Sequence, residues 1–170
     1  MTRHADQDAS FIAEALPAFV SEAKEQVASI EQLLLELEDA PDDRERLDAL
    51  FRCAHTVKGS AGIFGLDRVV AFTHHVETLL DRMREGRVAL TPALGTLLLE
   101  CNDEIRALVE QAPDAPEGED DRARRAALIE SLQAAGGDAP ATIAFTPQSM
   151  PSRSASGAAI SVECTIGAPQ

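Results

Sequence analysis

The sequence contains no tryptophan and no tyrosine among its 170 residues. A hydrophobic core must therefore be built from leucine, valine, isoleucine and alanine, together with six phenylalanines. Apolar runs are only a few residues long, so we expect no segment that crosses a membrane. The first ten residues, MTRHADQDAS, are polar and lack the apolar stretch of a secretory signal peptide. Both absences favour a cytoplasmic protein.

Cysteines and basic residues are also scarce. The three cysteines, Cys53, Cys101 and Cys164, lie far apart and form no CxxC pair, which fits a reducing cytosol. Lysine and arginine total 15 against 29 aspartates and glutamates, giving a formal net charge of -14. Binding to nucleic acid or to an anionic membrane requires a basic surface, so we expect neither as a partner. Basic or mixed-charge proteins remain possible partners.

Apolar residues recur at steps of three or four along most of the chain, which is typical of helices that bury one face. The pattern predicts helices over 8–39, 43–64, 67–85, from 92 to before 112, and over 119–135. Pro17 interrupts the first helix, either as a kink or as the first residue of the main helix after a short lead-in. No stretch before residue 139 has the pattern of a strand.

Capping and turn residues mark where these helices begin. We expect an aspartate of Asp42-Asp43 to cap the second helix, Asp67 to cap the third, and Thr91-Pro92 to open the fourth. Short connections make consecutive helices antiparallel neighbours. The sequence therefore predicts an all-α domain over 8–135, an up-down four-helix bundle with a fifth C-terminal helix packed alongside. Residues 136–170 are rich in Ala, Gly, Ser, Thr and Pro, and we interpret them as a flexible linker or disordered tail.

The stretch AHTVKGSAGIFG, residues 54–65, carries the strongest functional signal. Lys58 follows His55 at i+3, and Gly59 and Gly62 follow it at i+4 and i+7, so all lie on one side of the predicted helix. A glycine costs a helix interior about 0.5–1 kcal/mol relative to alanine. Two glycines beside one histidine indicate that something large must reach the imidazole.

The predicted second and third helices form a hairpin that turns near Gly65-Leu66. Residues equally far from the turn lie level in an antiparallel pair, which places Glu77 level with His55 and His74 level with Lys58. At about 1.5 Å per residue, these positions lie at most ~16 Å from the turn. His74 and Glu77 are also i and i+3 on one helix face. Four polar side chains are therefore expected to converge halfway along the bundle.

This set of side chains suits phosphoryl transfer through an imidazole. A carboxylate at Glu77 that accepts from Nδ1–H of His55 would fix the tautomer, leave the Nε2 lone pair pointing outward and raise its basicity. Lys58 would neutralise charge on a phosphoryl group. His74 would add a hydrogen bond or tune Glu77, and the two glycines would leave room for a partner domain.

The sequence resembles a known family at these residues. AHTVKGSAGIFG, followed by THHVETLLDRMREG at 73–86, is similar to the histidine-containing phosphotransfer (HPt, or P1) domain of CheA-type chemotaxis histidine kinases. The resemblance runs from about Phe11 to Leu132 and includes the LFRCAH lead-in at 50–55. His75 departs from the family pattern, in which that position is often apolar.

The resemblance implies a phosphorelay carrier. His55 would be phosphorylated, Glu77 would be its hydrogen-bond partner, and Lys58 and His74 would support them. The phosphodonor would be the ATP-bound kinase domain of a CheA-type kinase, and the acceptors would be aspartates of response regulators such as CheY and CheB. No cofactor is expected in this chain, whereas ATP and Mg²⁺ belong to the partner kinase domain.

Other interpretations remain open at this point. The sequence shows no dimerisation hairpin, ATP-lid glycine motif or coupling domain, so we expect either an N-terminal fragment of a kinase or a separate HPt module of another phosphorelay. A metal-binding bundle would use His55, His74 and Glu77 as zinc-type ligands, but Lys58 would place a positive charge beside the metal. An inert docking bundle would leave the cost of the glycines unexplained.

Overall fold

The structure, a computed structural model, describes residues 3–111 and 115–137. It contains five helices and, in these ranges, no strand. The helices are α1 (Arg3–Asp39), α2 (Arg44–Ile63), α3 (Asp67–Arg84), α4 (Pro92–Glu110) and α5 (Glu119–Gly136). The predicted all-α class is therefore confirmed.

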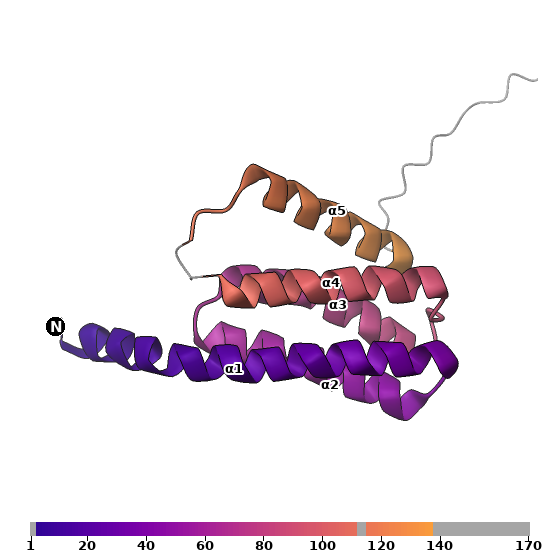
Figure 1. Cartoon of the computed structure of the whole chain (residues 1–170), viewed down its shortest axis with the longest axis horizontal. Coiled ribbons are helices and arrows are strands. Elements are labelled where there is room, and N and C mark those ends of the chain that lie inside the picture. Colours follow the sequence, from indigo (N-terminus) through magenta and orange to yellow (C-terminus); the bar gives the residue numbers. More distant parts are fainter. Residues whose placement is uncertain (1–2, 112–114, 138–170) are drawn as a thin grey trace, which may run out of the picture.

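Helices α1 to α4 form an antiparallel bundle, and α5 packs outside it against α3 and α4 (Figure 1). In the bundle, α1 contacts α2 and α4, while α3 contacts α2 and α4. The N-terminal part of α1, drawn in indigo, extends beyond the other helices (Figure 1). This arrangement confirms the predicted four-helix bundle with a fifth helix alongside.

The core is built from the apolar stripes that the helical periodicity predicts. Leucine, valine, isoleucine and phenylalanine side chains from α1 to α4 are almost fully buried, and Leu132 is the buried residue of α5. Not every apolar position of the periodic pattern is buried: Ile12 lies on the protruding part of α1 and is exposed, and Leu16, Phe51 and Leu97 are half-buried. Cys101 is buried among these apolar side chains, and burial raises its pKa to about 12, so the thiol stays neutral.

The helix starts follow local capping chemistry. Asp43 caps α2, as predicted, by accepting from the backbone N–H of Arg46 at 3.1 Å. Thr91 caps α4 by accepting from Leu94 N–H at 3.2 Å, and Pro92 is the first helical residue. The prediction for Asp67 is wrong, because α3 begins at Asp67 itself, after an N-cap at Leu66 without a side-chain hydrogen bond. The Asp67 carboxylate instead lies in the first turn, where the helix dipole favours negative charge.

Pro17 lies inside a continuous α1, so the alternative in which it begins the main helix is wrong. The proline and Ala13, four residues earlier, are both exposed. The carbonyl that loses its helical partner at Pro17 can therefore bond water. At the other end, α5 closes at Gly137 with φ +80°, and the rest of the predicted tail, 138–170, lies outside the described residues.

None of the helices in the described residues combines the length and the apolarity that a bilayer crossing requires.

Candidate functional site

The α2–α3 hairpin positions the candidate site. After α2 ends, Gly65 adopts φ +66°, and the N–H groups of Gly65 and Leu66 donate to the carbonyls of Gly62 and Ala61 at 3.3 and 3.0 Å. This pattern is a Schellman motif, which a glycine in the left-handed conformation stabilises. The connection is tight enough to fold α3 directly back along α2 and so to set which residues lie level.

His55 of α2 and Glu77 of α3 meet across this hairpin. The Nδ1 atom of His55 lies 2.6 Å from Oε1 of Glu77. The His55 side chain is 61% exposed, whereas the Glu77 side chain is 10% exposed. The imidazole is therefore held from the bundle side while most of its surface faces solvent.

Lys58 completes the contact on the bundle side. Its Nζ forms an ion pair with Oε2 of Glu77, so the carboxylate bridges a histidine and a lysine. Burial acts to raise the pKa of Glu77, but the interactions with Lys58 and His55 outweigh burial and hold the pKa below its usual range. Glu77 is consequently ionised near neutral pH.

The charge of Glu77 decides the tautomer of His55. An ionised carboxylate can only accept hydrogen bonds, so Nδ1 of a neutral His55 must carry the proton. Nε2 then holds the lone pair, and it is the ring nitrogen available to react. The hydrogen bond to the carboxylate also raises the basicity of that nitrogen.

Gly59 and Gly62 lie on the exposed side of α2 beside His55. A Cβ atom added at Gly59 would meet nothing within 4 Å, and one at Gly62 would meet only Val70 Cγ2 at an ordinary 3.9 Å. Packing within the chain therefore does not require glycine at either position. The glycines leave an open surface next to the imidazole.

Phe51 and Arg84 also belong to the surroundings of His55, and the sequence analysis missed their role. The Phe51 ring stacks on the His55 ring, with centroids 5.9 Å apart and planes inclined by 15°. The guanidinium carbon of Arg84 lies over the Phe51 ring, 4.2 Å from its centroid. The sequence signal that could have found Phe51 is its i−4 relation to His55 on the helix.

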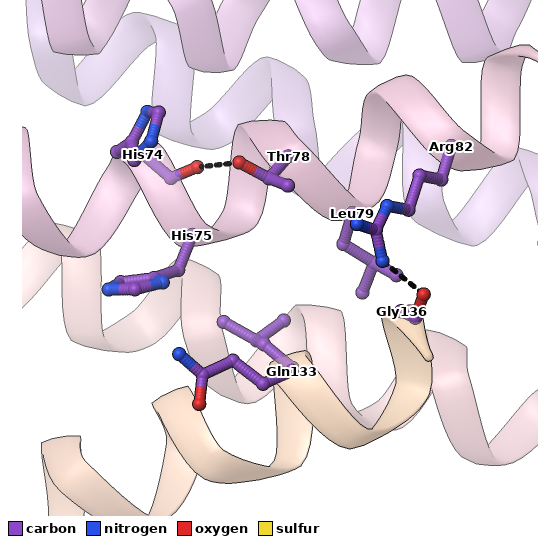
Figure 2. A pocket seen from close by; sticks show the side chains of 8 residues that line it. His74, His75, Thr78, Leu79, Arg82, Gln133 and Gly136 are labelled. Carbon is purple, nitrogen blue, oxygen red and sulfur yellow. Dashed lines mark hydrogen bonds between the residues drawn. The ribbon is translucent and has the colours of Figure 1, made fainter. Parts of the chain in front are cut away.

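His74 lies outside the cluster of His55, Lys58 and Glu77. Within the part of the chain that the structure describes, its imidazole makes no hydrogen bond or ion pair, and its ring lies 6.2 Å from that of His75. Both histidines line a pocket of about 240 Å³ between α3 and α5, together with Thr78, Leu79, Arg82, Leu132, Gln133 and Gly136 (Figure 2). Burial and the neighbouring His74 lower the pKa of half-buried His75.

The metal-site alternative finds no support in the geometry. Across residues 3–111 and 115–137, no three histidine, cysteine, aspartate or glutamate side chains come together as a ligand set for a metal ion. Glu77 directs its oxygens at His55 and Lys58.

Comparison with known proteins gives relatives that match most of this chain over a small part of their own length. The chain is 40% identical to the chemotaxis protein CheA of Rhizobium meliloti (strain 1021) over 123 residues, which are 72% of this chain and 16% of that protein. It is also 40% identical to the CheA of Treponema pallidum (strain Nichols) over 124 residues, 72% of this chain and 15% of that protein. The chain thus spans about one sixth of the length of these curated relatives.

Solved structures match over the bundle. The CheA phosphotransferase domain from Thermotoga maritima superposes with a TM-score of 0.55 at 35% identity, covering 57% of this chain and 92% of that chain. The phosphorylated P1 domain of CheA3, solved in complex with CheY6 from R. sphaeroides, gives a TM-score of 0.62 at 25% identity, covering 72% and 98%. The family model of the Hpt domain matches residues 14–115, the region that holds His55 and Glu77. By this match, the chain belongs to the Hpt domain family.

Proposed function

We propose that this chain is a phosphorelay carrier of a bacterial chemotaxis two-component system and that His55 is the residue phosphorylated. The observation that carries the proposal is the 2.6 Å contact between His55 Nδ1 and Glu77 on an imidazole whose side chain is 61% exposed. This contact leaves Nε2 as the nucleophile and presents it on the surface, where a second protein can reach it.

The first reaction is phosphorylation of His55 by ATP. The Nε2 lone pair attacks the γ-phosphorus, the N–P bond forms, and the P–O bond to ADP breaks with its electron pair leaving on ADP. Nδ1 keeps its proton throughout, and Glu77 stabilises the positive charge that the ring acquires. Lys58, which is paired with the same carboxylate, is close enough to the site to offset negative charge on the phosphoryl group.

The second reaction passes the phosphoryl group to an aspartate of a response regulator. A carboxylate oxygen attacks phosphorus, the N–P bond breaks, and the neutral imidazole of His55 is restored. A CheY-like or CheB-like receiver is the partner we propose, and the solved complex of a related P1 domain with CheY6 supports it. The open surface at Gly59 and Gly62 gives such a receiver access to the ring.

The phosphodonor we propose is the catalytic domain of a CheA-type kinase, because the chain is similar to segments of CheA proteins. ATP and Mg²⁺ would be bound by that domain, and this chain supplies the acceptor nitrogen. The carrier has no turnover of its own in this scheme. Reaction with ATP, together with free thiols at Cys53 and Cys101, supports a cytoplasmic location. We further propose that 8–135 is the phosphotransfer domain.

The deciding experiment is phosphorylation of the chain by a CheA-type kinase domain with Mg²⁺ and γ-labelled ATP. We expect the wild type to gain a label that is lost in acid and stable in alkali, as a phosphorus–nitrogen bond requires. His55→Gln should gain none while keeping the circular dichroism of a folded bundle. His75→Gln is the matched control and should be labelled normally. A folded wild type that stays unlabelled, or label that persists in His55→Gln, would refute the proposal.

A further inference from the structure

Three side chains are stacked beside one another on the α2–α3 hairpin: His55 and Phe51 of α2 and Arg84 of α3. His55 stacks on Phe51, one turn earlier, with ring centroids 5.9 Å apart and a 15° angle between planes. Arg84 covers the Phe51 ring at 4.2 Å from its centroid and reaches Asp48, a further turn back, with Nε–Oδ1 at 3.6 Å. Phe51 therefore lies between the arginine and the histidine along the helix.

The exposure of His55 makes this stacking important. The His55 side chain is 61% exposed. Within the described residues, its imidazole makes one hydrogen bond, from Nδ1 to Oε1 of Glu77. One hydrogen bond fixes the position of one ring nitrogen but leaves the ring free to rock about that point. A flat contact along the ring restricts this motion, because offset-stacked aromatic rings attract each other at centroid distances of about 4.5–7 Å.

Phe51 is itself held from the other helix. Arg84 comes from the last turn of α3, and its Nη2 donates to Asp81 at 2.8 Å while its Nε approaches Asp48. These carboxylates hold the guanidinium over the phenyl ring, where a cation is attracted by the π electrons. The half-buried Phe51 is thus fixed between a charged group on α3 and the reactive ring on α2.

We propose that Phe51 is a positioning residue for His55 and that Arg84 holds Phe51 in place. The stacked ring keeps Nδ1 on Glu77 and aims Nε2 outward, so the share of molecules ready to react is higher than the hydrogen bond alone would give. This role rests on the proposed function, in which His55 Nε2 is the nucleophile.

The test compares Phe51→Leu, which keeps an apolar side chain but removes the flat ring, with Phe51→Tyr, which keeps the ring. We expect the labelling rate to fall about two- to tenfold in Phe51→Leu and to stay near wild type in Phe51→Tyr. Arg84→Gln should show a smaller fall. Arg106→Gln removes an equal charge on the opposite α1–α4 side of the bundle, where Arg106 pairs with Glu31, and should leave the rate unchanged.

Nitrogen-15 NMR of His55 gives a second measurement that does not depend on labelling. In the wild type we expect the Nδ1–H tautomer of His55 to dominate. In Phe51→Leu we expect a larger share of the Nε2–H tautomer, and urea titration should show that this variant is still folded. Unchanged rates and an unchanged tautomer ratio in Phe51→Leu would overturn the positioning role. If the wild type takes no label, the proposed function fails instead, and the tautomer ratio then decides the inference alone.

Discussion

Glu77 acts on His55 from inside the bundle. Its side chain is 10% exposed, yet its pKa is held below the usual range because Lys58 and His55 both interact with it. A nearly buried carboxylate that remains ionised is a strong and fixed hydrogen-bond acceptor. At the scale of single residues, we therefore propose that the reactivity of the exposed His55 imidazole depends on a carboxylate that solvent barely reaches.

We predict that Glu77→Ala slows phosphorylation of His55 by about tenfold to a hundredfold, the range found when the hydrogen-bond partner of a metal-bound histidine is lost. Transfer from already phosphorylated His55 to a receiver should slow less, because that step does not require a basic Nε2. Rapid-quench measurement of both steps checks this. Glu85→Ala, an exposed glutamate beyond the end of the same helix, is the control. Equal slowing of the two steps would contradict the assigned role.

The sequence predicted the meeting of His55 and Glu77, but it did not predict the stacking of the Phe51 ring on His55. The level of His55 with Glu77 follows from helix rise and the position of the turn, which are properties of the backbone. Periodicity identifies the apolar face of a helix but not the edge of that face, so it does not separate half-buried Phe51 from the buried residues beside it. Its stacking depends on the placement of Arg84 from α3, which is a tertiary contact.

Helix α5 is attached to the bundle by apolar contacts and by ion pairs. Leu132 is its buried residue, while Glu104 of α4, only 4% exposed, accepts from Arg124 at 3.0 Å and from Arg125 at 2.9 Å. Arg125 also pairs with Glu117, just before the helix. A single buried carboxylate on α4 thus receives two arginines of α5. The sequence predicted that α5 packs alongside the bundle. It did not predict that Glu104 would pair with Arg124 and Arg125, because α4 contacts α1, α3 and α5 and the sequence does not show which of them Glu104 faces.

We predict that Glu104→Gln loosens α5 without unfolding the bundle. The substitution leaves Arg125 nearly buried with a weaker partner, and removing such a charge-assisted hydrogen bond costs about 1.5–3 kcal/mol. Amide hydrogen exchange should accelerate in α5 and stay slow in the centres of α1 to α4. Glu100→Gln, one turn earlier on α4 and exposed, is the matched control. Unchanged exchange in α5 would show that Leu132 and its neighbours hold the helix by themselves.

Over the whole molecule, carboxylates carry much of the stability that depends on pH. Several have a pKa below their usual range: hydrogen bonds to Gln32 and Arg46 lower the pKa of Glu36, and the Arg46 backbone N–H lowers that of Asp43. In Glu117, hydrogen bonds to Arg125 and Arg122 outweigh burial, so its pKa is also lowered. Groups of this kind bind fewer protons in the folded state than in the unfolded chain.

We therefore predict that the free energy of unfolding falls as the pH drops below about 4.5, near the ordinary pKa of glutamate. The contribution is fully present above the unfolded pKa values and is lost as the pH falls through the lower folded values. Urea titrations between pH 7 and pH 3 measure it. The stability difference between wild type and Glu77→Gln should shrink across the acid range. A difference that stays constant with pH would mean that the pKa of Glu77 is not lowered by folding.

The bundle as a whole was predictable because four stripes of apolar residues at helical spacing, joined by short connections, admit few arrangements. The details that were missed depend on context beyond the pattern. The helix passes through Pro17 because water can reach the carbonyl freed at Ala13. Asp67 begins α3 because the residue that closes the Schellman turn, Leu66, is itself the N-cap.

The three-residue connection of Phe64, Gly65 and Leu66 has one more consequence. Helices α2 and α3 each continue without interruption from this connection to the site. The number of residues in the connection therefore sets which residue of α3 faces His55. One inserted residue would rotate α3 by about 100° and advance it by about 1.5 Å, bringing apolar Val76 to the level of the imidazole. The length of this connection therefore determines which side chain of α3 faces His55, although the connection itself lies away from the histidine.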